Sequence, residues 1–217
     1  MKKRKFLFLG VILLIISIIY TIAVKNIDVS SIGPNNSSVG FSKINSTVHN
    51  KFDFNEKWYK ITKYVGFIPF ALVAFYGFTG LIQLIERKSL KKVDKKLIYL
   101  GIFYIIFVLI YFFFEKVIIN YRPVLIDGEL EASYPSSHTL MAVCLCGSSM
   151  IISKNFVKNE LIGKILNILT GIVMVIIEFG RILSGVHWIT DIVGGIIIAT
   201  CLLSFLNVAL LSLEKEE

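Results

Sequence analysis

Three residues near the C-terminal end of the sequence, Arg181, His187 and Asp191, have the types and spacing of a phosphate-handling site. If the chain is helical from Trp188, the carboxylate of Asp191 lies one turn below His187, where it can accept the imidazole Nδ1–H and fix the tautomer. The other ring nitrogen is then free to attack. The planar, permanently charged guanidinium of Arg181 suits a tetrahedral anion such as phosphate. A His-x-x-x-Asp pair is also often only a structural hydrogen bond, so the surroundings of these residues matter.

Those surroundings are predicted to be a membrane. The chain has 217 residues, 55% of them hydrophobic and 18% charged, which is too apolar for a soluble domain of this size. Six apolar runs are long enough, or nearly so, to cross a hydrocarbon core of about 30 Å as helices. They cover residues 6–24, 62–86, 97–119, 139–153, 161–180 and 188–213. We predict an all-α polytopic membrane protein, a six-transmembrane-helix bundle forming a single domain over residues 1–217.

The formal net charge of +8 follows this topology and does not indicate a nucleic-acid partner. Lysines and arginines gather before the first run and in the connections after the second and fourth runs, which lie on one side of the membrane. The positive-inside rule makes that side the cytoplasm, with both termini there. The first run is expected to be an uncleaved anchor in the cell membrane. Residues 25–60 then form an outer loop, in which His49 is expected to be solvated.

Ionisable residues between apolar runs are expensive and usually functional. With a helical rise of about 1.5 Å per residue, several of them reach the outer membrane boundary. They are Glu115, Lys116, Arg122, Glu178, Arg181, His187 and Asp191. Pro123 is expected to help end the third helix, and Glu178 to orient Arg181 as an intrahelical partner. The active site is therefore predicted at the outer membrane boundary.

The sequence from Tyr134 to His138 opens the fourth run with a second set of candidates. Pro135 and Ser136 are favourable near a helix start, and a helix N-terminus offers free N–H groups and a positive dipole end to an anion. A serine cap is common where no ligand binds. His138 adds weight, because one histidine can attack while the other donates a proton. The three cysteines, Cys144, Cys146 and Cys201, lack metal-ligand spacing and are expected to be small core residues; no metal or cofactor is predicted.

These motifs resemble the three signature motifs of the type-2 phosphatidic acid phosphatase superfamily, membrane lipid phosphatases related in fold to vanadium-dependent haloperoxidases. The resemblance rests on Arg122-Pro123, on Pro135-Ser136-Ser137-His138, and on Arg181 followed by His187 and Asp191. It implies a metal-independent hydrolase in which His187 forms a phosphohistidine, Asp191 orients it and His138 protonates the leaving oxygen. The phosphate ligands that it implies are Arg122, Arg181, Ser136, Ser137 and Lys116.

The sequence departs from the superfamily at three positions. The first motif has a lysine seven residues before its arginine, but Glu115 stands there and Lys116 follows it. Neighbouring residues on an ideal helix differ by about 100° in direction, so Lys116 takes the place of that lysine only if the helix is distorted. Glu115 facing a phosphate would repel it. Ser137 replaces a glycine, and Gly180 replaces a serine that could donate a hydrogen bond.

The partners predicted from the resemblance are the bilayer and a membrane lipid phosphate. A polyprenyl pyrophosphate such as undecaprenyl pyrophosphate, phosphatidic acid and phosphatidylglycerol phosphate all remain open as the substrate. Two other classes of function were weighed. A non-catalytic lipid-phosphate-binding protein has no need of a nucleophile with its orienting carboxylate. A small transporter is expected to hold its charges near the membrane midplane between internal repeats, whereas here they gather at one boundary.

Overall fold

The computed structural model describes residues 1–214, and the named elements in that part of the chain are all helices. They are α1 (Lys2–Asn26), α2 (Ser42–His49), α3 (Glu56–Val65), α4 (Ile68–Arg87), α5 (Lys95–Lys116), α6 (Ser137–Ile152), α7 (Glu160–Leu183) and α8 (Ile189–Leu213). Three short 3₁₀ helices, η1 (Pro34–Asn36), η2 (Leu90–Lys92) and η3 (Ser153–Asn155), lie in the connections. The predicted all-α class is confirmed.

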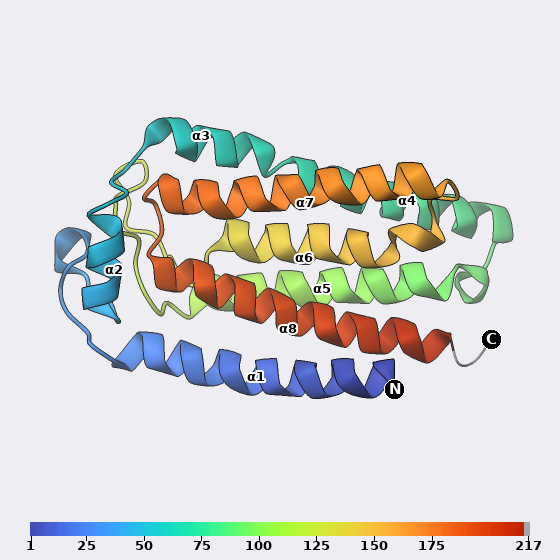
Figure 1. Cartoon of the computed structure of the whole chain (residues 1–217), viewed down its shortest axis with the longest axis horizontal. Helices are drawn as coiled ribbons and strands as arrows, with labels where there is room; N and C mark the ends of the chain where they lie inside the picture. Colours follow the sequence, from blue (N-terminus) through green and yellow to red (C-terminus); the bar gives the residue numbers. More distant parts are fainter. Residues whose placement is uncertain (215–217) are drawn as a thin grey trace.

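The long helices run side by side along one axis and form a bundle (Figure 1). Within the described residues, five stretches are long and apolar enough to cross a membrane: α1, α3 with α4, α5, α7 and α8. Outside these stretches, the short α2 lies at one end of the bundle (Figure 1), and α6, with 16 residues, contacts α4, α5, α7 and α8. Most of its side chains are buried by these neighbours, so α6 forms the centre of the bundle and the long helices surround it.

The core of the bundle lies between α4, α5, α6 and α8 and contains the buried, free Cys144, as expected for a small core residue. The other two cysteines are also free and buried. Near its start, α8 comes very close to the chain before α6: a Cβ on Gly194 would lie 2.3 Å from the ring of Tyr134, and one on Gly195 would lie 2.8 Å from Thr139. These two glycines therefore let the start of α8 pack directly against the start of α6.

Two of the predicted spans differ from the helices. The run over residues 62–86 is two helices, because α3 ends at Val65 and α4 begins at Ile68 with Pro69 in its first turn, where a missing N–H is tolerated. The third helix ends at Lys116 instead of residue 119, so Pro123 does not end it. The residues that follow, Val117 to Ile119, are all β-branched and disfavour helix.

The predicted outer loop, residues 25–60, is also partly helical and is folded against the end of the bundle. It contains α2 and the start of α3. Asn45, fully buried, donates to the Gly40 carbonyl (2.8 Å) and to Thr190 Oγ1 (2.9 Å) and accepts from the Thr190 amide (3.3 Å). His49 is half-buried with its ring 5.3 Å from that of Trp188, so the expectation that it is solvated was wrong.

The two ends of the bundle differ in what they hold. The start of α1 and the end of α8 lie at one end, with the connections from α4 to α5 and from α6 to α7 (Figure 1). At the opposite end lie α2, the segment from residue 117 to residue 136 and the connection from α7 to α8 (Figure 1). We call this second end the site end, because every candidate residue of the sequence lies at it.

Candidate active site

His187 lies in the connection between α7 and α8 and is almost completely buried. Its Nδ1 lies 3.8 Å from Asp191 Oδ2, which is too long for the direct hydrogen bond expected from the sequence. The hydroxyl of Ser133 stands between the two: its Oγ lies 3.0 Å from His187 Nδ1 and donates to Asp191 Oδ2. Asp191 Oδ2 also accepts from the Trp188 amide (3.0 Å), because α8 begins at Ile189 with Trp188 as its N-cap residue.

This arrangement fixes the tautomer of His187. An ionised carboxylate only accepts hydrogen bonds, so the Ser133 hydroxyl must donate its proton to Asp191. The oxygen of Ser133 then accepts from His187, which places the ring proton on Nδ1. Nε2 keeps its lone pair, and the Nη1 of Arg122 lies 3.2 Å from it. His187 is therefore held with its unprotonated nitrogen toward a guanidinium, which is where a phosphate would be attacked.

Burial and nearby charge both keep His187 neutral. Its pKa lies well below the ordinary value, chiefly because the side chain is buried, and further because of the positive charges of Arg122 and Arg181 and of the nearby His138. A neutral imidazole is the form that acts as a nucleophile. The electrostatics of the site thus agree with the tautomer.

Arg122 comes from the segment between α5 and α6 and is 9% exposed. Its Nε lies 2.9 Å from Glu131 Oε2 in an ion pair whose acidic partner is partly exposed. The segment is fixed to α8 by Trp188, whose ring nitrogen donates to the Tyr121 carbonyl at 2.7 Å. The backbone next to Arg122 is therefore tied to the residue that follows His187.

Arg181, in the last turn of α7, is fully buried and largely without partners. Its Nη1 donates to Thr62 Oγ1 at 3.3 Å, and its guanidinium lies over the ring of Tyr59 at 5.6 Å from the centroid. Within the described residues, Nε and Nη2 have no hydrogen-bond partner. The expected ion pair with Glu178 does not form in the described part of the chain, and both buried carboxylate oxygens of Glu178 also lack a hydrogen-bond partner. Two free, buried N–H donors of this kind need an anion.

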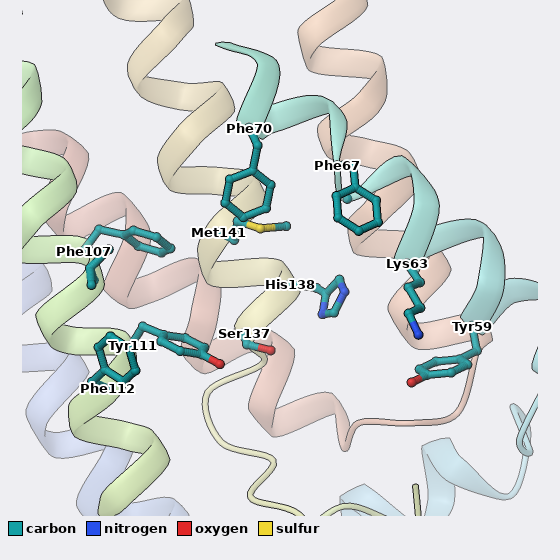
Figure 2. A pocket seen from close by; sticks show the side chains of 12 residues that line it. Tyr59, Lys63, Phe67, Phe70, Phe107, Tyr111, Phe112, Ser137, His138 and Met141 are labelled. Atoms are coloured by element: carbon teal, nitrogen blue, oxygen red, sulfur yellow. The ribbon is translucent and has the colours of Figure 1, made fainter. Parts of the chain in front are cut away.

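The start of α6 supplies the remaining groups. Ser136 is its N-cap residue, accepting from the Thr139 amide at 3.5 Å, as the sequence predicted. The Ser136 amide donates to the Asp191 carbonyl at 3.0 Å, which ties this helix start to α8. The next amides, of Ser137 and His138, are at the position where a helix leaves N–H groups without intrahelical acceptors. His138 points away from the bundle centre into a large cavity (Figure 2).

That cavity has a volume of about 530 Å³ and lies between α3 and α4 on one side and α5 and α6 on the other. One end is polar, with Tyr59, Lys63, Ser137 and His138, and the rest is apolar (Figure 2). The apolar part is lined by Phe67, Phe70, Phe107, Phe112 and Met141, together with the backbone of Gly66 and parts of Val108 and Tyr111. His138 therefore stands where a polar site meets a space suited to hydrocarbon.

The structure brings all but one of the predicted site residues together. Lys116, the last residue of α5, is exposed and does not line any of the cavities that His138 or His187 lines. Glu115 does line one of them, with Ser133, Ser137 and His187. The acidic residue at this position, and not its basic neighbour, thus faces the site.

Sequence reasoning missed four residues that complete the site. For Ser133 the sequence contains one signal, because this polar residue lies just before the second motif. Tyr59, Thr62 and Lys63 belong to α3 and gave no comparable signal, because nothing in the sequence brings them near Arg181 and His138. No group of three or more His, Cys, Asp or Glu side chains that could hold a metal ion is found within residues 1–214.

Comparison with known proteins agrees with this geometry. Residues 112–211 match the family model of the PAP2 superfamily. This part of the chain belongs to the PAP2 superfamily. It contains every motif from which the resemblance was inferred, so that inference is confirmed. No curated protein sequence matches the chain.

One solved structure has the same fold. It is a crystal structure described as the first transmembrane PAP2 type phosphatidylglycerolphosphate phosphatase from Bacillus subtilis. The match has a TM-score of 0.57 and covers 91% of this chain and 94% of that chain, at 18% sequence identity. At this identity the likeness shows the PAP2 fold and its multi-pass membrane architecture. Superfamily and fold together support a membrane lipid phosphatase.

Proposed function

We propose that this PAP2 protein hydrolyses a phosphate or pyrophosphate head group of a membrane lipid through a phosphohistidine on His187. The observation that carries the proposal is the hydrogen-bond chain from His187 Nδ1 through Ser133 to Asp191. It leaves Nε2 unprotonated next to Arg122. A purely binding protein has no use for a histidine held in this way, because a neutral nitrogen attracts a phosphate less than a cation does.

The reaction has two steps. His187 Nε2 attacks the phosphorus, the bond from phosphorus to the lipid oxygen breaks, and His138 gives its proton to that oxygen. Water then attacks the phosphohistidine, gives its proton to His138 and releases inorganic phosphate. Both histidines return to their starting states, so no other reactant is consumed.

The transferred phosphate would be held by the groups that lack partners. Arg181 offers Nε and Nη2, and the amides of Ser137 and His138 point from the start of α6. Arg122, whose Nη1 lies 3.2 Å from His187 Nε2, would turn its Nη groups to the phosphate. Ser136 supports the same helix start as its N-cap. Lys116 is the predicted ligand that the geometry supports least, since it is exposed at the end of α5.

The location of the site supports a lipid substrate. The site end lies opposite the chain termini (Figure 1), and the positive-inside rule favours the outer boundary of the membrane for it. There the phosphate can face water while the lipid tail remains among the apolar side chains next to His138. Polyprenyl pyrophosphate, phosphatidic acid and phosphatidylglycerol phosphate all fit this description.

The test is release of inorganic phosphate by the detergent-purified protein from these three lipids, measured with and without EDTA. Wild type is compared with His187→Ala, and folding of both is checked by gel filtration and thermal unfolding. Release by wild type that the folded variant lacks is expected. Release that EDTA abolishes would disprove metal independence. No release from any lipid would favour a lipid-phosphate-binding protein instead, which direct binding of the same lipids would test.

A further inference from the structure

We propose that Lys63 binds a second phosphate on the leaving group, so that this site is built for a lipid diphosphate in preference to a lipid monophosphate. The inference rests on the proposed function and narrows its substrate class. Its basis is the position of Lys63, which lines the cavity beside His138, whereas Arg122 lies against His187. Arg181 reaches the same helix α3 through Thr62. Neither the family match, which begins at residue 112, nor the motifs include Lys63.

The site has one side for the transferred phosphate and another for the leaving group. Arg122 and the nucleophilic His187 lie together on one side, where the transferred phosphate belongs. His138 is the proton donor to the leaving oxygen and lines the cavity of about 530 Å³. Because the donor must touch that oxygen, whatever the oxygen carries extends into the cavity. The cavity is therefore the leaving-group side.

Lys63 lies in the last turn of α3, and its ammonium group points to the polar end of the cavity, toward the space between His138 and Tyr59 (Figure 2). One turn later in the chain, a Cβ on Gly66 would lie 3.4 Å from the His138 ring, so the end of α3 touches this histidine. Lys63 is thus close to the leaving oxygen but on the cavity side of it.

Within residues 1–214, no carboxylate lies within ion-pair distance of Lys63, whereas Lys60 on the same helix pairs with Glu56 at 2.7 Å. The Lys63 side chain is exposed, so its ammonium is not held by the protein and is free to bind an anionic ligand in the cavity that it lines. The diacylglycerol released from phosphatidic acid carries no charge there. When a lipid diphosphate is cleaved, the leaving group is a lipid monophosphate, and its negative charge lies on the cavity side of the bond that breaks.

In the proposed reaction, His187, His138 and Lys63 act on different atoms of the diphosphate. His187 attacks the terminal phosphorus, the bond to the bridging oxygen breaks, and the electron pair stays on that oxygen, which takes the proton of His138. The departing group is a lipid monophosphate. Lys63 neutralises its charge as it forms, and the phenylalanines of the cavity hold the start of its hydrocarbon chain. Water hydrolyses the phosphohistidine as before.

The experiment uses two probes with the same tail, farnesyl diphosphate and farnesyl monophosphate, in detergent micelles. The quantity measured is the ratio of kcat/KM for the diphosphate to kcat/KM for the monophosphate. Lys63→Met keeps the length of the side chain and removes its charge, and we expect that ratio to fall by about 10- to 100-fold, the effect of one lost charge-assisted hydrogen bond. Lys63→Arg should restore most of it. Lys60→Met is the matched control and should leave the ratio as in wild type.

The outcomes separate the two proposals. An equal loss for both probes would show that Lys63 contacts the transferred phosphate or supports the fold, and would overturn the inference. An unchanged ratio in Lys63→Met would overturn it as well. If wild type and His187→Ala release equal phosphate from each probe, the proposed function itself fails, whatever Lys63 does.

Discussion

His187 Nδ1 and Asp191 Oδ2 face each other at 3.8 Å, a distance that a third residue bridges. The bridging hydroxyl of Ser133 accepts from the imidazole and donates to the carboxylate. Asp191 therefore orients the nucleophile through the Ser133 hydroxyl and not by direct contact. A hydroxyl relay transmits the preference for one tautomer, because a Ser133 hydroxyl that donates to the carboxylate of Asp191 can only accept from His187.

Replacing Ser133 with alanine should interrupt this relay. The Nδ1 proton then loses its acceptor, the other tautomer becomes available, and we expect kcat to fall by about 10- to 100-fold with KM little changed. Ser204→Ala is the control, since Ser204 is also buried but donates only to the Thr200 carbonyl of its own helix. Steady-state phosphate release measures both. Equal kcat in the two variants would mean that Asp191 orients His187 without the serine.

The low pKa of His187 makes a prediction about the acid side of the pH profile. Because burial and the charges of Arg122 and Arg181 lower this pKa, the neutral nucleophile persists below the ordinary histidine value of about 6.5. We expect the acid limb of kcat/KM to lie below that pH, and to move to higher pH in Arg122→Gln. The same substrate is used for both proteins, so its own ionisation is common to both profiles.

The kcat profile should also fall on its alkaline side, because His138 must carry a proton to give to the leaving oxygen. In the free site, burial and the positive charges of Arg181, Arg122 and Lys63 lower the pKa of His138 to about 3, so this limb depends on the negative charge of the bound phosphate and is expected in kcat, not in kcat/KM. The full kcat profile is then bell-shaped. A flat profile through the histidine range would contradict the two-histidine scheme. An acid limb that stays in place in Arg122→Gln would show that the charge of Arg122 does not contribute to the low pKa of His187.

Glu115 is expected to weaken phosphate binding, because it lines the small cavity that also contains His187. Glu115→Gln removes the repulsion, and KM for a lipid phosphate should fall by about 2- to 5-fold, a small effect because the side chain is exposed. Lys116→Gln is the partner experiment and should change KM little. Should Lys116→Gln raise KM more than Glu115→Gln lowers it, the lysine contacts the substrate after all.

Asn45 is expected to hold the start of α8 in place. Asn45→Ala leaves Thr190 and the Gly40 carbonyl without their partners, which costs about 1–3 kcal/mol. Thermal unfolding in detergent should show a lower Tm. Asn50→Ala is the control, because Asn50 is exposed and in an ordinary helical conformation. An equal Tm for the two variants would mean that the outer segment adds nothing to the stability of the bundle.

Hydrophobic length predicted most of the fold. The apolar runs gave the six principal helices, with α5, α6, α7 and α8 placed to within a few residues. Length alone missed the break between α3 and α4, because an apolar run continues through Pro69 while the backbone hydrogen bonds do not. It also missed α2, whose polar composition is typical of a loop and whose position depends on the buried contacts of Asn45.

The motifs predicted the histidines, the aspartate and both arginines at one end of the bundle, but not how they are connected. The spacing of His187 and Asp191 suggested direct contact because it assumes one continuous helix, whereas His187 lies before α8 begins. The lysine of the family's first motif corresponds to the position of Glu115, and Lys116, one residue later, was expected to take its place at the phosphate. On a regular helix such a displacement turns the side chain away, and α5 stays regular to its end.

The bond from Arg181 to Thr62 joins residues 119 positions apart and crosses the boundary of the family match, which begins at residue 112. A fragment trimmed to the matched residues would keep every signature motif yet lose Thr62 and Tyr59, the two neighbours that hold this guanidinium in place. We therefore expect the motif-bearing part not to work as an enzyme by itself. Chimeras that exchange it between PAP2 proteins need a matching α3, and their success should depend on that helix more than on the motifs.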